Sequence, residues 1–266
     1  MQKWSSMSKS HLIKLIYRGV LFLSALIYFI VMLATKRASY GESVLFVSFG
    51  QGIPVFLIIM TLIFVPEMAM RFFPNAHEAL GTQKMYKSNF VPTKDENAKP
   101  IKMHWSRTLM VFGAWALLNG IFGTLNVFGI LSDDIMVLLC LAYSVCDLIC
   151  IMFFCPFQKL MMQNKCCQTC RIYNWDYPMM FTPFLFLILK PGPILHYIML
   201  GFALVVLLIW EITYKLHPER FSEVTNECLS CKSCQEKLCR HNKNYPHKKA
   251  IKDLLEHKKT KTANKN

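Results

Sequence analysis

Charged side chains are scarce in this chain, and this scarcity indicates its class. Of 266 residues, only 17% are Asp, Glu, Lys or Arg, whereas 54% are hydrophobic and 13% are aromatic. A soluble domain carries roughly 25% charged residues. The composition therefore excludes a disordered chain, a collagen-like chain and a small disulfide-rich scaffold, and it favours an integral membrane protein.

The signatures of several enzyme classes are also missing. The chain contains no G-x-x-x-x-G-K-[ST] phosphate-binding loop, no G-x-S-x-G nucleophile elbow and no H-E-x-x-H zinc-protease motif. Their absence leaves open whether the protein is an enzyme. The net charge of +14 has to be interpreted through its distribution between loops, and we expect no specific nucleic-acid partner.

Long stretches without a charged residue predict the membrane spans, because a transmembrane helix needs about 17 to 25 mostly apolar residues. Such stretches predict an all-α bundle of six transmembrane helices within a membrane domain at 1–215. The six spans lie at about 19–35, 43–66, 108–132, 135–158, 173–189 and 193–212.

The last two spans are predicted to form a tight helical hairpin. The region Tyr177 to Trp210 has 34 residues, which would make about 51 Å of continuous helix. That length exceeds a hydrocarbon core of about 30 Å. Pro191-Gly192-Pro193 would break such a helix in its middle. A re-entrant hairpin is the alternative.

Basic residues predict the orientation. With a cytoplasmic N-terminus, 27 of the 30 Lys and Arg residues fall on the inner side, and only Lys36, Arg37 and Lys190 fall outside. Cytoplasmic loops of membrane proteins are enriched in basic residues. We therefore expect a multi-pass protein of the cell membrane with both termini cytoplasmic and no cation inside a span. The basic tail at 248–266 is expected to be disordered and attracted to anionic lipids.

Cysteines supply the clearest chemical signal. Four of the eleven cysteines lie in the fourth span, where we expect them to pack as small hydrophobic side chains. The other seven form two groups about sixty residues apart, one directly after the fourth span and one in the segment 216–247. The predicted hairpin leaves the membrane on the side where it entered. Both groups are therefore expected in one cytoplasmic cysteine-rich cap.

The spacing of these cysteines predicts a metal site. Paired C-x-x-C spacing lets two thiolates chelate one ion through a tight turn, and two pairs complete a tetrahedral zinc site. A reducing cytoplasm argues against structural disulfides. The favoured zinc ligands are Cys167, Cys170, Cys231, Cys234 and Cys239, and the weaker candidates are Cys166, Cys228 and His241.

Three alternatives to zinc remain open. Cys228 to Cys239 has the spacing C-x2-C-x2-C-x4-C, which is close to the bacterial ferredoxin run but has one residue more before the last cysteine. This favours an iron–sulfur cluster as the rival cofactor. Cys167 and Cys170 could instead form a redox dithiol. The remaining alternative is that the thiols carry no ligand.

Polar residues inside the predicted spans form a second group of candidates. Asp147 lies in the middle of the fourth span, where a carboxylate is costly unless it is paired, protonated or beside water. With no cation expected in any span, hydrogen bonds from Asn119, Asn126 or Gln51 are its predicted partners. A proton or ion site, and hence a small transporter, is as plausible as polar contacts that join helices.

Several short sequences carry a resemblance to a known family. They are CPFQ at 155–158, NKCCQTC at 164–170, RIYNWD at 171–176, MMFTP at 179–183 and HPERF at 217–221, followed by the later cysteine cluster. Together they resemble a family of uncharacterised prokaryotic polytopic membrane proteins with a CCxTCRIxNWD-like motif. The resemblance covers roughly the C-terminal half and implies no activity. Ferredoxin-type maturation proteins of the membrane also join spans to cysteine runs, but the cysteine spacing here departs from theirs.

Overall fold

The computed structural model describes residues 6–35, 45, 54–74, 78–94, 98–101, 105–164, 166–188 and 193–230. Every regular element in these ranges is helical, and the isolated β-bridge found there joins Pro92 to Asn226. The predicted all-α class is confirmed for this part of the chain.

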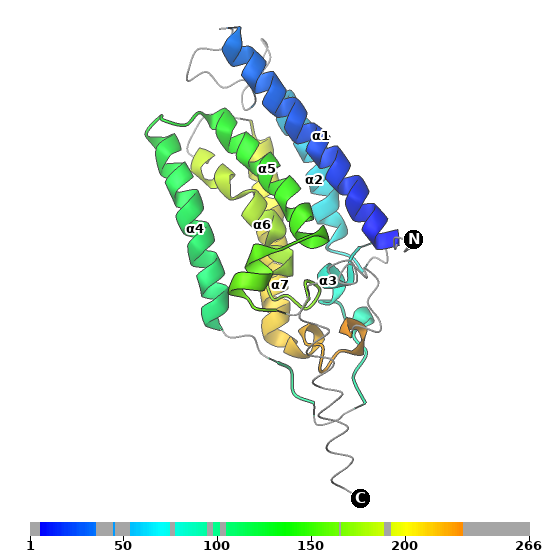
Figure 1. Ribbon diagram of the computed structural model, residues 1–266. Coiled ribbons are helices and arrows are strands. Elements are labelled where there is room, and N and C mark those ends of the chain that lie inside the picture. The colour runs from blue at the N-terminus through cyan, green and yellow to red at the C-terminus, as the bar shows by residue number, and fades with distance from the viewer. Residues whose placement is uncertain are drawn as a thin grey trace, which may run out of the picture.

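Four helices are long and apolar enough to cross a membrane, namely α1 (Ser6–Ala34), α4 (Trp105–Val127), α5 (Asp133–Met152) and α7 (Leu195–Leu216). A fifth, α2 (Val55–Met70), is shorter but strongly apolar. Figure 1 shows these helices gathered into one bundle, in which α1 packs on α5 and α2 packs on α7. These helices support the prediction of a membrane protein.

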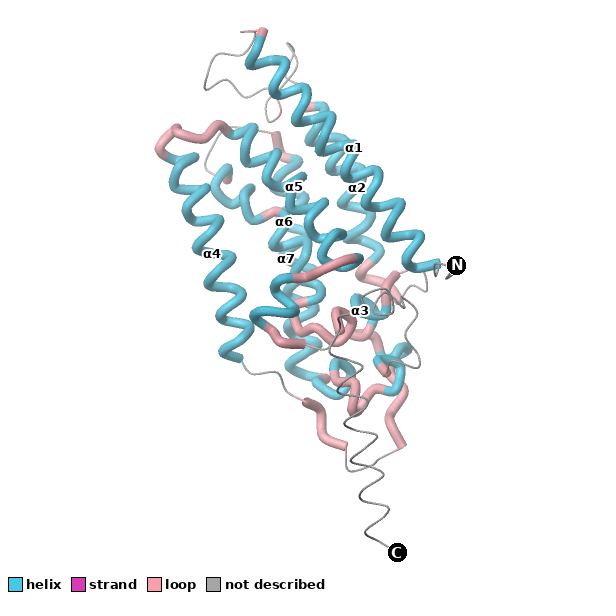
Figure 2. Tube along the Cα trace, viewed as in Figure 1, coloured by secondary structure: helices cyan, strands magenta, loops and turns pink. Residues whose placement is uncertain are grey.

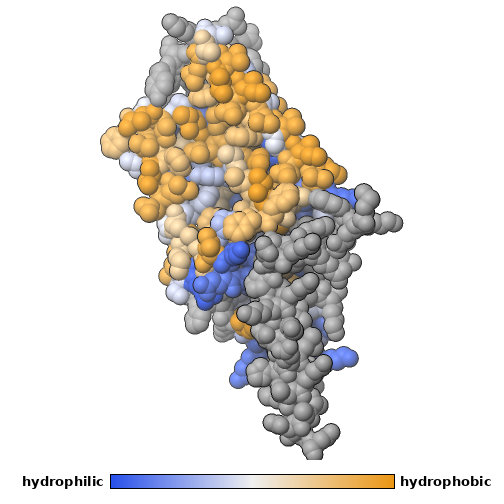
Figure 3. Space-filling view, viewed as in Figure 1, coloured by the Kyte–Doolittle hydropathy of each residue, from blue (hydrophilic) through white to orange (hydrophobic). Residues whose placement is uncertain are grey.

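Apolar side chains cover the outside of this bundle. In Figure 3 they form a broad region over the helices, whereas hydrophilic residues gather toward the end where the short helix α3 (Leu80–Gln83) lies. Large hydrophobic side chains that are more than half exposed occur on three of the long helices. Examples are Ile13, Val20, Ile27, Phe112, Leu117, Ile121, Leu208 and Ile212. Such a surface is what lipid chains would cover.

The segment predicted as the fifth span is not one helix. It consists of a 3₁₀ turn (Tyr173–Trp175), the short helix α6 (Asp176–Met180) and a second 3₁₀ stretch (Thr182–Leu187). Pro178 and Pro183 each lack the N–H that a continuous helix would need, which explains the irregular path. Figure 2 shows this broken segment threading between the longer helices.

Aromatic packing holds the broken segment at the centre of the bundle. Phe181 stacks on Tyr177 and on Phe184, and Phe64 of α2 packs edge-on against Phe181 with ring centroids 5.5 Å apart. All four side chains are buried. Irregular backbone at membrane depth is tolerated where protein surrounds it, and here α4, α5 and α7 all contact this segment.

One glycine sets the distance between α4 and the broken segment. A Cβ atom built on Gly123 would lie 2.2 Å from the ring of Phe186. Gly113 and Gly120 on the same helix have no atom within 4 Å of such a Cβ. The three glycines therefore separate the effect of close packing from the effect of glycine on helix propensity.

We predict that Gly123→Ala lowers the stability of the protein by about 1 to 3 kcal/mol, because the added methyl group overpacks the contact with Phe186. Gly120→Ala is the matched control and should be neutral or stabilising, because alanine favours a helix by about 1 kcal/mol over glycine. Thermal unfolding of the two variants in detergent measures the difference. Equal stability of the two would contradict this account of the contact.

Candidate functional site

Three loop segments, 78–94, 166–175 and 217–230, pack together at the hydrophilic end of the molecule; we call this region the loop end. Its centre is Lys84, whose side chain is fully buried. The Lys84 ammonium donates to the backbone carbonyls of Gln168 at 2.6 Å and Cys170 at 2.8 Å. Burial lowers the pKa of Lys84 to about 7.

Aromatic rings enclose the same amine. Its nitrogen lies 5.1 Å from the ring centroid of Trp210, 5.6 Å from that of Phe221 and 5.9 Å from that of Tyr173. A cation at such distances from ring faces is attracted by their quadrupoles. Lys84 therefore joins the loop of the first cysteine group to the end of α7 and to the segment that follows α7.

The segment after α7 is fixed to the loop end by further hydrogen bonds. Arg220 donates to the carbonyl of Met85 at 2.9 Å, and the N–H of Glu227 donates to the carbonyl of Val91 at 2.8 Å. Asn226 is fully buried and its carboxamide accepts from the N–H of Cys228 at 3.1 Å. Cys228 thus lies at the loop end. The predicted ligands Cys231, Cys234, Cys239 and His241, and the polar residue Gln51, lie outside the described residues.

The first cysteine group forms the tight turn that its spacing predicts. The N–H of Cys170 donates to the carbonyl of Cys167 at 2.9 Å. The thiol of Cys167 donates to Gln158 Oε1 at 2.8 Å, whereas Cys170 is buried. Burial raises the pKa of Cys170, and the neighbouring Lys84 opposes that shift. Among the described residues, no group of three His, Cys, Asp or Glu side chains could by itself hold a metal ion.

Asp147 has a basic partner, which corrects the expectation that no cation lies inside a span. Arg18 is buried within α1, and its Nη1 lies 3.8 Å from Asp147 Oδ2. The expectation failed because Arg18 was taken as the boundary of an uncharged run. The helix instead begins at Ser6 and continues through the arginine.

Arg18 makes its stronger pair with Glu67 of α2. Arg18 Nη2 lies 2.5 Å from Glu67 Oε2, and the hydroxyl groups of Tyr17 and Tyr177 also donate to the Glu67 carboxylate. A buried charge is tolerated only when ion pairing and hydrogen bonds compensate its lost hydration. The carboxylate of Glu67 therefore joins α1, α2 and α6.

Two further ion pairs lie in the same region. Arg71, just after α2, donates to both carboxylate oxygens of Asp176 and to Asn174 Oδ1. Arg171 donates to both oxygens of Glu211 on α7. These forked pairs are the geometry that a guanidinium group favours with a carboxylate. The first pair fixes the start of α6 to the end of α2. The second pair fixes the loop at 166–175, which carries the first cysteine group and is called the cysteine loop below, to α7.

The two asparagines predicted as partners of Asp147 bond elsewhere. Asn119 donates to the carbonyl of Trp115 and accepts from the hydroxyl of Tyr143. Asn126 donates to the carbonyl of Leu131 and to Asp133 Oδ1, which closes the turn between α4 and α5. Both side chains therefore stabilise the α4–α5 pair.

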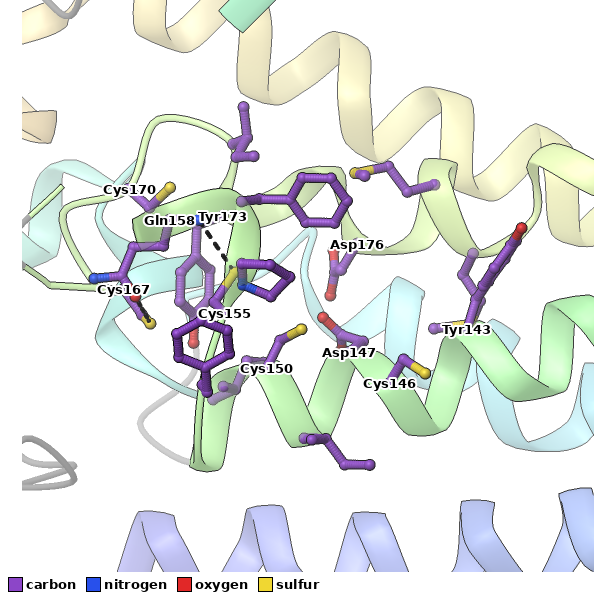
Figure 4. Close-up of a pocket in the computed structure, with 18 of the residues that line it drawn as sticks. Tyr143, Cys146, Asp147, Cys150, Cys155, Gln158, Cys167, Cys170, Tyr173 and Asp176 are labelled. Atoms are coloured by element: carbon purple, nitrogen blue, oxygen red, sulfur yellow. Dashed lines mark hydrogen bonds between the residues drawn. The ribbon is translucent and has the colours of Figure 1, made fainter. Parts of the chain in front are cut away.

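The structure also contains a cavity that the sequence did not predict. It has a volume of about 420 Å³ and lies among α4, α5, α6 and the loop after α5. Figure 4 shows Cys146, Asp147 and Cys150 projecting from α5, with Cys155, Cys167 and Cys170 contributed by the following loop. The expectation of simple packing fits Cys140, which is buried in the core. The other three cysteines of that span line the cavity.

Gln158 connects two of these sulfurs. Its N–H donates to Cys155 Sγ at 3.4 Å, and its side-chain oxygen accepts from the thiol of Cys167. Cys155 follows the end of α5. Cys146 and Cys150 are four residues apart in the sequence. This spacing alone predicts that they share one face of the helix.

No family model, curated protein or solved structure matches the chain.

We predict different costs for removing the charges of Glu67 and Asp147. Glu67→Gln leaves the buried Arg18 without its closest partner and should cost about 3 to 5 kcal/mol of stability. Asp147→Asn should cost less than Glu67→Gln, because its contact with Arg18 is longer, at 3.8 Å, and asparagine keeps the shape of the side chain. Denaturant unfolding in detergent measures both variants. A larger cost at Asp147 would reverse the order of the two pairs.

Proposed function

We propose that the protein is a multi-pass cell-membrane protein that crosses the bilayer six times, with both termini cytoplasmic. Its cytoplasmic cysteine-rich cap binds a metal ion, with zinc favoured, in a structural or regulatory role. The basic tail at 248–266 contacts anionic lipids. The metal fixes the tail segment to the helix bundle, because its ligands come from the loop after α5 and from the chain after α7.

The observation that carries this proposal is the joining of two distant segments through residues 84 and 85. Lys84 donates hydrogen bonds to the carbonyls of Gln168 and Cys170, and Arg220 donates a hydrogen bond to the carbonyl of Met85. The chain that leads into the second cysteine group is thereby attached to the loop that carries the first.

The ligand chemistry also favours a metal. Cys167 and Cys170 lie on one tight turn, the arrangement in which two thiolates chelate one ion. Metal binding requires loss of the thiol protons. The burial that raises the pKa of Cys170 would be offset by the charge of the ion. Cys231, Cys234 and Cys239 supply the remaining ligands, and Cys166, Cys228 or His241 serve as substitutes.

An iron–sulfur centre is the second candidate, with a role in electron transfer across the cap. The four cysteines from Cys228 to Cys239 favour it by their spacing. A transporter that uses Asp147 is the third candidate, favoured by the position of that carboxylate on the cavity wall. The cofactor candidates differ in colour, because zinc has no redox chemistry and a filled d shell.

We predict about one zinc ion per chain in the purified, colourless protein. Cys170→Ser and Cys234→Ser should each release most of the metal, because serine is a poor substitute for a thiolate ligand. Cys140→Ser is the control, since Cys140 lies in the core away from the loop end. Elemental analysis and an absorption spectrum measure the result. A visible absorption band together with bound iron would favour the iron–sulfur cluster over zinc. A wild-type protein without bound metal would refute both cofactors.

We predict that labels placed at residues 85 and 165 react only from the cytoplasmic side of the membrane. The reason is the concentration of basic residues in the segments that hold these positions. A single cysteine introduced at residue 190, between the last two spans, should react only from the outside. Reaction with a membrane-impermeant maleimide in intact cells and in inverted vesicles measures the orientation. External labelling at 165 would overturn the topology.

A further inference from the structure

The cavity beside α5 has an aromatic wall and the size of a small-molecule site. Its volume of about 420 Å³ lies in the range that binds drug-sized ligands. Trp115, Tyr143 and Phe157 line it and contact one another. The ring centroid of Trp115 lies 4.7 Å from that of Tyr143 and 5.9 Å from that of Phe157. Three rings from α4, α5 and the loop after α5 thus form one continuous aromatic cluster on the wall.

The polar tips of two of these rings bond to protein groups. Trp115 Nε1 donates to Thr182 Oγ1 at 3.0 Å, and the hydroxyl of Tyr143 donates to Asn119 Oδ1 at 3.3 Å. Neither acceptor is among the residues that line the cavity. The rings therefore contribute mainly apolar and π-electron surface to the cavity. Such surface attracts a cation that lies over a ring face.

The charged groups on the wall are carboxylates. Tyr143 and Asp147 are four residues apart on α5, so they share one face of that helix. Figure 4 shows Asp147 and Asp176 pointing toward one another at the cavity. No Lys, Arg or His is among the described residues that line it. The sign of the charge on the wall therefore disfavours an anionic ligand.

The cluster behind the wall carries one uncompensated negative charge. Both arms of Arg71 hold Asp176, and Glu67 is the close partner of Arg18. Asp147 has the longer contact with Arg18, at 3.8 Å. Two guanidinium groups thus face three carboxylates, and Asp147 is the carboxylate without a close partner of its own. A cation in the cavity would balance its charge.

The cavity borders the apolar surface of the molecule. Ile149 and Phe154 line it, yet their side chains are 41% and 46% exposed. Both lie close to the end of α5, a candidate membrane span. Met179 and Met180 add apolar surface on the wall. A ligand that fits this lining needs a hydrophobic body.

We propose that the cavity binds a hydrophobic organic cation of the quaternary ammonium or phosphonium type. Its charge lies beside Asp147, and its apolar body lies against the rings of Trp115, Tyr143 and Phe157. This inference deepens the transporter candidate, because it rests on Asp147 and names the chemical class that Asp147 would bind. It does not depend on the metal site, since Asp147 and the three rings are not among the proposed metal ligands.

Other classes of ligand fit this lining less well. A Ca²⁺ or Mg²⁺ ion needs six or more oxygen ligands, including water, whereas most of the wall is apolar. A neutral hydrophobic compound would leave the charge of Asp147 unbalanced. An organic cation matches both properties, because its charge is spread over apolar groups and needs no ring of oxygen ligands.

The test uses the full-length protein in nanodiscs, with tetraphenylphosphonium as the probe. Tetraphenylborate is the matched control, because it has nearly the same size and shape and the opposite charge. Isothermal titration calorimetry measures binding after subtraction of empty nanodiscs. We expect one saturable site per chain for the phosphonium ion and none for the borate ion. Absence of a saturable phosphonium site, or equal binding of the two ions, would overturn the proposal.

Variants of Asp147 test the charge. Asp147→Asn keeps the shape of the side chain and should weaken phosphonium binding by about tenfold or more. Asp147→Glu keeps the charge and should retain most of the affinity, so loss in the asparagine variant alone excludes misfolding. Glu227→Gln is the control for net charge, because Glu227 is exposed at the loop end and should not affect binding. Wild-type affinity in Asp147→Asn would refute the role of the carboxylate.

Variants of Tyr143 test the aromatic wall. Tyr143→Phe keeps the ring and should bind like the wild type, whereas Tyr143→Leu should weaken phosphonium binding by about fivefold. Equal affinity of the two variants would contradict the contribution of the rings. Removal of metal by a chelator should leave the affinity unchanged, so failure of the metal site and failure of the cation site are separate results.

A lipid head group with a quaternary ammonium is the other source of this chemistry. Replacing phosphatidylethanolamine by phosphatidylcholine in the nanodiscs keeps the surface charge and adds choline head groups. We expect the same phosphonium affinity in both lipids. Weaker binding in phosphatidylcholine would assign the cavity to the lipid head group and overturn the proposal of a free cation.

Discussion

The cost of burying positive charge governs the architecture of this protein. Four cations, Arg18, Arg71, Lys84 and Arg171, are almost completely removed from solvent. A buried cation without partners costs several kcal/mol, so each must find acceptors. Each finds them on a different segment of the chain: Arg18 on α2, Arg71 on α6, Lys84 in the cysteine loop and Arg171 on α7. These four side chains determine which segments can lie together, whereas apolar packing alone would allow many arrangements.

The cysteine loop contacts two different parts of the molecule in this arrangement. On one side, Lys84 holds its backbone from within the loop end. On the other side, the Cys167 thiol meets Gln158, which also contacts Cys155 on the cavity wall. A metal bound by Cys167 would therefore be separated from the cavity wall by a single glutamine. Ligation of Cys167 would remove the hydrogen bond that its thiol donates to Gln158.

The sequence predicts the long helices well and the polar contacts poorly, for physical reasons. An uncharged apolar run is a local property, and four of the predicted spans overlap the helices α1, α4, α5 and α7. The treatment of charged residues as boundaries failed at Arg18, because its partner Glu67 is distant in sequence and only folding brings them together. A helix break was also predicted at Pro191-Gly192-Pro193, of which only Pro193 lies within the described residues. Pro178 and Pro183 were not given the same weight in the fifth segment.

The candidate site also has parts that the sequence predicts and parts that it does not. The turn at Cys167 and Cys170 is local, and its spacing predicted it. The cavity is built from α4, α5, α6 and a loop, so no local spacing describes it. Lys84 gave no signal at all, since an isolated lysine in a loop is normally solvated. Its burial depends on rings from three segments, Tyr173, Trp210 and Phe221.

Ile149 and Phe154 line the cavity beside α5, and their side chains are also exposed on the apolar surface of the molecule. Access to the cavity from this surface has a consequence for how ligand binding must be assayed. A compound that reaches the cavity from the hydrocarbon region is diluted by lipid and not by water. Its occupancy then follows its mole fraction in the bilayer, so adding empty vesicles would lower saturation at constant total concentration. Potency would rise with the partition coefficient of the compound, and two preparations with different lipid-to-protein ratios would give different apparent affinities for the same molecule.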